Sequence, residues 1–118
     1  WKKTGIFPIM HLLGVRRELL EAHPFLVGAL MKAFSASKAS AEALLADTSA
    51  TKVTMPFVED HLSEAKKLMG DNFWSYGING NEATINTFLD HHHRQGLSSR
   101  RVMIEELFPK NAAESYSL

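Results

Sequence analysis

The stretch from Ile6 to Val15 constrains what this chain can fold into more than any other, because it is apolar almost throughout. Pro8 near its beginning suits a strand better than a helix, so we expect one β-strand here. Because alternate residues of a strand point to opposite faces, one face carries Phe7, Ile9, His11, Leu13 and Val15. The opposite face carries Met10, Leu12 and Gly14. Both faces are apolar, which is typical of a strand that is covered on both sides.

No second stretch of comparable strand character follows in the remaining residues. A lone strand would leave its backbone donors and acceptors unpaired. We therefore expect its neighbouring strands to lie in a part of the protein outside these 118 residues, or in another subunit. The chain also begins at Trp1 without an initiator Met, which fits a missing amino-terminal portion that would complete the sheet.

The rest of the chain reads as helices separated by turn formers. Two helices should begin at a proline, at Pro24 and at Pro56, and a third should be capped by Asn81 and terminated by Gly96. The predicted elements are a turn at 16–21, a long helix ending before Asp47, a helix at 56–70, a loop at 71–77 that packs through its aromatic residues, a helix at 82–95 and a turn at 104–108.

Composition excludes several classes of partner. Thirteen basic residues balance thirteen acidic ones, so there is no overall field to attract a nucleic acid. The longest apolar stretch is far shorter than the roughly 20 residues that a membrane helix needs. With no cysteine there is neither a disulfide nor a thiolate metal site.

Metal and cofactor motifs are also weak. His91, His92 and His93 step about 100° each around a helix, so they cannot all face one ion; we expect His92 to pack beside Phe88 on the inner face. His61 with Glu59 or Glu64 offers only weak local geometry. Gly-rich phosphate loops and a nucleophile elbow are absent from the sequence, and we expect neither metal nor cofactor.

His11 is the strongest local candidate for chemistry, because a titratable ring inside an apolar strand needs a hydrogen-bond partner. The alternative is a core histidine bonded to a backbone carbonyl. Lys3 and Thr4 lie just upstream, where an ammonium and a hydroxyl could receive an anionic ligand. Arg16 and Arg17 at the other end of the strand read as solvated charges.

Several strings in the chain resemble a known family. Phe-Pro-Ile-Met-His at 7–11 and Arg-Arg-Glu-Leu-Leu-Glu-Ala-His-Pro at 16–24 are similar to the carboxyl-terminal region of 4,5-dihydroxyphthalate decarboxylases and their relatives. Later landmarks of the same resemblance are Leu-Met-Gly-Asp at 68–71, Trp74, Tyr-Gly at 76–77, Gln-Gly-Leu at 95–97 and Glu-Glu-Leu-Phe at 105–108. Met103 departs from the pattern, since a Ser or Thr is expected there.

The resemblance implies an α/β protein, the carboxyl-terminal part of a two-lobed periplasmic-binding-protein-like fold, mostly helical with one main strand near the amino terminus. Residues 1–110 would belong to one lobe and 111–118 would form a loose tail. The implied activity is the non-oxidative decarboxylation of a hydroxylated aromatic dicarboxylate, with His11 as the catalytic acid or an anchor and with Lys3 and Thr4 holding the spectator carboxylate. Such an enzyme would be cytoplasmic and could be a homo-oligomer.

Two other classes stay open. The same cleft in a periplasmic solute receptor of an ABC-type transporter would bind a small aromatic or anionic ligand without changing it. A helical interaction module is the third possibility, and it requires that these residues fold alone as a cooperative monomer.

Overall fold

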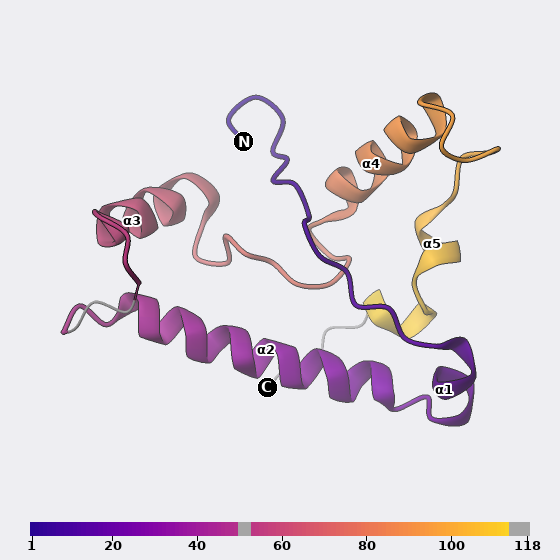
Figure 1. Ribbon diagram of the computed structural model, residues 1–118, viewed down its shortest axis with the longest axis horizontal. Coiled ribbons are helices and arrows are strands. Elements are labelled where there is room, and N and C mark those ends of the chain that lie inside the picture. Colours follow the sequence, from indigo (N-terminus) through magenta and orange to yellow (C-terminus); the bar gives the residue numbers. More distant parts are fainter. Residues whose placement is uncertain (50–52, 114–118) are drawn as a thin grey trace.

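The computed structural model describes residues 1–49 and 53–113 (Figure 1). Within these ranges the regular structure is helical, and the order of the elements follows the sequence prediction. The elements are α1 (Arg17–Ala22), α2 (Leu26–Ala46), α3 (Val58–Met69), α4 (Glu82–Arg94), α5 (Ile104–Leu107) and the 3₁₀ helix η1 (Lys110–Ala113).

Helix α2 is the longest element and the platform for both of its neighbours. It is rich in alanine and other good helix formers, and it ends at Ala46, directly before Asp47, as predicted. Both α3 and η1 pack against it. The side chain of Asn111 in η1 donates a hydrogen bond to the carbonyl of Pro24 at 3.4 Å, which ties the carboxyl-terminal region to the start of α2. Residues 111–113 thus belong to a 3₁₀ helix where the sequence predicted the start of a loose tail, and residues 114–118 lie outside the described residues.

The starts of the helices differ from the prediction. Neither proline is the first helical residue, because α2 begins at Leu26 and α3 at Val58. Before α3 the backbone of Phe57 is left-handed, with φ 59°, and a right-handed helix cannot include it. The ends follow the sequence more closely: Gly70 and Gly96 adopt positive φ just beyond α3 and α4.

Asn81 precedes α4 but does not cap it with its side chain. The amide instead closes the loop before the helix: Ser75 Oγ donates to Asn81 Oδ1 at 3.0 Å, and Asn81 Nδ2 donates to the carbonyls of Ser75 at 3.3 Å and Gly77 at 3.0 Å. The predicted cap is wrong because the loop competes for the same side chain.

The buried core lies between α4 and α5. Ile85 and Leu89 of α4 and Ile104 of α5 are buried, with Ile78, Val102 and Phe108 packed against them. The sequence also placed Phe88 on this inner face, and that is wrong because 63% of the residue is exposed. The predicted partner of Phe88 is right, since the rings of Phe88 and His92 lie 5.7 Å apart.

The single strand predicted over Ile6–Val15 is not formed within residues 1–49 and 53–113, which contain no strand at all. These residues run as an irregular segment from the amino-terminal turn to α1 (Figure 1). A strand exists only with a partner strand, and the described part of the chain supplies none. From Phe7 to Val15, no backbone hydrogen bond joins the segment to another described residue.

The chain exposes far more surface than a compact protein of its size. Its accessible surface is 9197 Å², where a compact 13.2 kDa protein exposes about 6,400 Å². Its radius of gyration is 17.0 Å, against about 13.5 Å for a compact domain of this length. Large apolar side chains make up part of this surface, among them Met10, Leu12 and Leu13. No helix in the described ranges is long and apolar enough to cross a membrane.

Candidate functional site

His11 lies on the irregular amino-terminal segment, and its residue is exposed. It makes no hydrogen bond, ion pair or ring contact with another described residue. The sequence placed this ring inside an apolar strand where it would need a buried partner. The structure leaves this residue exposed, because no other described part of the chain covers residues 8–14.

Lys3 and Thr4 belong to the turn that precedes this segment. The turn is closed by hydrogen bonds from the amides of Thr4 and Gly5 to the carbonyl of Trp1, at 3.1 and 2.7 Å. The hydroxyl of Thr4 accepts a hydrogen bond from the amide of Ile6 at 3.2 Å, a local turn that leaves its own proton available to a ligand. Both residues are exposed. No polar contact in the described chain joins either of them to His11.

The contacts that fix the amino-terminal segment come from the loop between α3 and α4. The rings of Phe7 and Trp74 meet edge to face, with their centroids 5.4 Å apart and their planes at 63°. This geometry is a favoured one for aromatic pairs. The sequence predicted that the aromatic residues of this loop pack down onto the protein, and the Phe7–Trp74 contact confirms this for Trp74.

Lys38 of α2 holds the same loop from the opposite side. Its ammonium donates to Asn72 Oδ1 at 2.9 Å and to the carbonyl of Trp74 at 3.0 Å, and it lies 5.2 Å from the centre of the Tyr76 ring. The Lys38 side chain is only 18% exposed. Its positive charge therefore interacts mainly with the loop and little with solvent.

Glu42 completes this arrangement one helical turn further along α2. Its Oε1 atom is buried and has no hydrogen-bond partner, and it lies 3.8 Å from the ammonium of Lys38. A buried carboxylate oxygen without a hydrogen bond depends on a nearby opposite charge. Lys38 thus serves two groups, the loop and Glu42.

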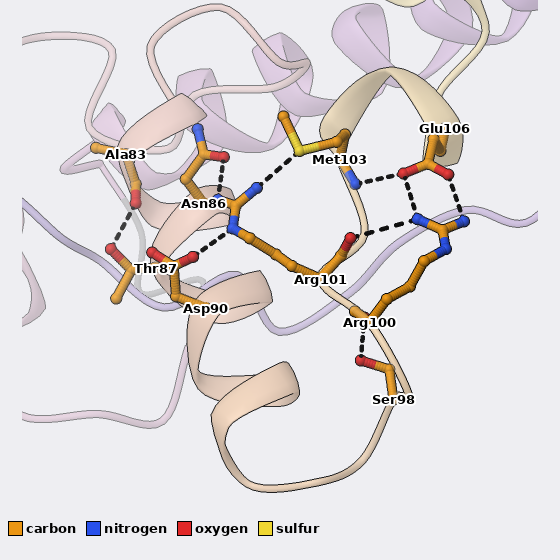
Figure 2. A network of polar contacts seen from close by, with 9 residues as sticks. All are labelled: Ala83, Asn86, Thr87, Asp90, Ser98, Arg100, Arg101, Met103 and Glu106. Atoms are coloured by element: carbon orange, nitrogen blue, oxygen red, sulfur yellow. Dashed lines mark hydrogen bonds and ion pairs between the residues drawn. The ribbon is translucent and has the colours of Figure 1, made fainter.

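A second polar network joins α4 to α5 (Figure 2). Arg101 bonds Asp90 and donates to Asn86 Oδ1 at 3.0 Å, both on α4. Figure 2 shows the Arg101 side chain reaching across to α4, where its planar guanidinium contacts Asn86 and Asp90, one helical turn apart. The hydrogen bond and charge of Arg101 lower the pKa of Asp90, with smaller contributions from the positive charge of Arg94 and His91.

The neighbouring arginine stabilises α5. Arg100 forms a two-pronged pair with Glu106, with N–O distances of 2.9 and 2.5 Å, and Glu106 also accepts the amide of Met103 at 2.8 Å. This last bond caps the start of α5 even though Met103 stands where a Ser or Thr was expected. The guanidinium of Arg100 and the amide of Met103 together hold the pKa of Glu106 at about 2, below its ordinary value of 4.5.

Two of the three consecutive histidines approach the same residue, Ser98, beyond the end of α4. His92 Nδ1 lies 3.2 Å from the hydroxyl of Ser98, and His93 Nδ1 lies 3.4 Å from the carbonyl of the same residue. They help to hold the chain after α4, where positive charge also complements the helix dipole. Among the residues that the structure describes, no group of three His, Asp or Glu side chains is arranged to hold a metal ion, at the triplet or at His61.

Comparison with known proteins supports the motif resemblance. No family model matches the chain. The chain is 52% identical, over all of its 118 residues, to 4,5-dihydroxyphthalate decarboxylase of Comamonas testosteroni, and it spans 36% of that protein's length. The resemblance predicted from the strings at 7–11 and 16–24 is therefore confirmed, and it extends over the whole chain.

Proposed function

We propose that this chain is the carboxyl-terminal part of an enzyme that removes carbon dioxide, without oxidation, from a hydroxylated aromatic dicarboxylate of the 4,5-dihydroxyphthalate type. The observation that carries the proposal is the 52% identity along the entire chain to a protein of that name. Identity at this level over 118 residues supports a shared fold, and the named activity is the simplest one to share.

The intact protein would have the two-lobed periplasmic-binding-protein-like fold, and residues 1–110 would belong to one lobe. The unpaired backbone from Phe7 to Val15 supports this, because a strand of that fold would need partners from the remaining polypeptide. The large exposed apolar surface supports it too, since that polypeptide would cover it. We place the enzyme in the cytoplasm.

The chemistry needs a proton, an anchor and an electron source. A hydroxyl para to the leaving carboxylate pushes electrons toward the ring carbon that bears it, and that carbon takes a proton. The carbon–carbon bond then breaks, its electron pair returns to the ring, and carbon dioxide leaves. Histidine is the side chain used most often to deliver a proton in this way, and we assign the step to His11.

Lys3 and Thr4 would bind the second carboxylate, which is not lost. The exposed Lys3 offers an ammonium, and the free proton of the Thr4 hydroxyl offers a second donor to an anion. His11 lies eight positions after Lys3. In the intact enzyme, the amino-terminal segment would have to place His11 beside the reacting carbon of the substrate ring, with Lys3 and Thr4 at the second carboxylate.

The test uses the complete protein and measures carbon dioxide released from 4,5-dihydroxyphthalate and from phthalate, which lacks both hydroxyls. We expect release from the first only. His11→Asn should lower kcat about 100-fold or more, the usual contribution of a positioned acid. His91→Asn, the same change at an exposed helical histidine, should stay within about twofold of the unaltered protein.

Two results would contradict the proposal in different ways. Undiminished turnover in His11→Asn removes this residue from the mechanism while the activity stands. Tight binding of 4,5-dihydroxyphthalate with no release of carbon dioxide by the unaltered protein refutes the enzyme and favours the solute receptor.

A further inference from the structure

We propose that Lys38 is a positioning residue for the segment that carries His11, acting through the loop of Trp74 and the ring of Phe7. The inference rests on the proposed function for its catalytic meaning, but the chain of contacts behind it stands on the structure alone. In Figure 1 the connection from α3 to α4 passes over α2 and meets the amino-terminal segment, and Trp74 in this connection contacts both Lys38 and Phe7.

The first link joins α2 to the loop. Lys38 donates to Asn72 and to the backbone carbonyl of Trp74, so it fixes the loop at two positions with one residue between them. The loop also approaches α2 at Gly77, where a Cβ atom would lie 3.6 Å from the terminal methyl of Met31. With φ at 86°, Gly77 holds a conformation that other residues rarely adopt, which favours this close approach.

The second link joins the loop to the segment. Phe7 packs edge-on against Trp74, and both rings are about 40% exposed, so the contact lies at the rim of the molecule. From Phe7 to Val15 this is the one ring contact, and no hydrogen bond or ion pair accompanies it among the described residues. His11 lies four residues further on, at most about 14 Å along the chain.

The negative charge of Glu42 balances the positive charge of Lys38 and helps to hold its ammonium in position. The buried Oε1 of Glu42 stands 3.8 Å from the ammonium and has no hydrogen-bond partner. Lys38 is therefore held between a fixed negative charge and two fixed acceptors, which restricts its rotamers. A lysine held in this way sets the height of the loop above α2, and with it the position of the Trp74 ring that Phe7 meets.

The test uses the complete protein and a variant that removes the ammonium without leaving an unpaired carboxylate. This is Lys38→Met combined with Glu42→Gln, and Glu42→Gln alone is its reference. Lys32→Met, the same change at an exposed lysine of α2, is the matched control. Phe7→Leu removes only the ring contact with Trp74 and leaves α2 unaltered. It therefore keeps the test valid if the double variant folds poorly.

Amide hydrogen exchange of residues 7–13 is the readout that does not depend on activity. We expect faster exchange there in the double variant and in Phe7→Leu, a smaller rise in Glu42→Gln, which keeps both hydrogen bonds of Lys38 to the loop, and no change in Lys32→Met. Unchanged exchange in the double variant overturns the inference, whatever the protein catalyses.

Turnover is the second readout. Displacing the proton donor should lower kcat about 10- to 100-fold and change KM less than about threefold. Adding Phe7→Leu to the double variant should lower kcat no further than about threefold, because both changes break one chain of contacts. Multiplied effects, or a rise in KM at unchanged kcat, overturn the positioning role. If the unaltered protein releases no carbon dioxide, the proposed function fails and hydrogen exchange alone decides the role of Lys38.

Discussion

The surface of this chain predicts that residues 1–118 do not hold their structure alone. Their accessible surface exceeds that of a compact protein of equal mass by about 2,800 Å². If a little over half of this excess is apolar, about 1,600 Å² of apolar surface stays in water that a compact fold would bury. At about 25 cal/mol per Å², the missing stabilisation is about 40 kcal/mol.

That shortfall is several times the 5–15 kcal/mol by which a folded domain is ordinarily stable. Even half of it would exceed the whole stability of a typical domain. If the proposed function holds, we expect the rest of the enzyme to cover part of this surface, including the apolar residues of the amino-terminal segment.

The assay is urea unfolding of the isolated 118 residues, followed by circular dichroism and by the binding of a hydrophobic dye. We expect a gradual loss of helix with no cooperative transition, and dye binding in the absence of urea. The same helices should unfold cooperatively within the complete protein. A sharp transition in a monomeric sample, with the slope expected for a chain of this length, would refute the reasoning and favour the independent helical module.

Two further predictions concern the corner between α4 and α5 in the complete protein. Leu89→Ala should lower the free energy of unfolding by about 2–4 kcal/mol, because this residue is 4% exposed and lies in the only buried cluster of the described residues; an unchanged urea midpoint would contradict the packing. Glu106→Gln should be destabilising at pH 7, since the folded state holds the pKa of Glu106 at about 2 and so favours its ionised form. The stabilisation is fully present above pH 4.5 and is lost as the pH falls toward 2, so the two urea midpoints should converge over that range and a constant difference would count against the Arg100 pair.

The helices could be predicted from the sequence because their signals are local. The apolar spacing of α2 and α4 lies within those helices, and Gly70 and Gly96 follow within two residues of the helices that they end. Errors arose where a local signal had a competitor. Asn81 looks like a helix cap, but its amide serves the preceding loop, and Pro56 is followed by a left-handed residue that delays the helix.

The strand predicted at 6–15 is not formed, because strand pairing, unlike helix formation, depends on residues far away in the sequence. Its apolar pattern indicates burial, and only a partner strand converts that tendency into a hydrogen-bonded ladder. The helical turn of α1 directly after it needs no such partner, and it was predicted to within one residue.

In the candidate site, too, local features could be predicted from the sequence and long-range contacts could not. His11, Lys3 and Thr4 were recognisable by residue type and by neighbourhood, but contacts among them cannot be read from a linear pattern. Lys38 was missed because its partners Asn72 and Trp74 lie 34 and 36 residues away. The one local signal for it was a single charge in the Ser- and Ala-rich stretch at 35–40, where a solvated surface helix would normally carry several.

The three hydrogen bonds of the Asn81 amide have a consequence for how the aromatic loop behaves. They join residues 75, 77 and 81 into a closed ring that involves no atom of α2. The tryptophan beside this ring is thus attached to a piece of chain whose shape is already set, so little conformational entropy is lost when it settles on the long helix. If the contacts with α2 were lost, residues 75–81 would therefore move as a rigid unit and keep their internal hydrogen bonds.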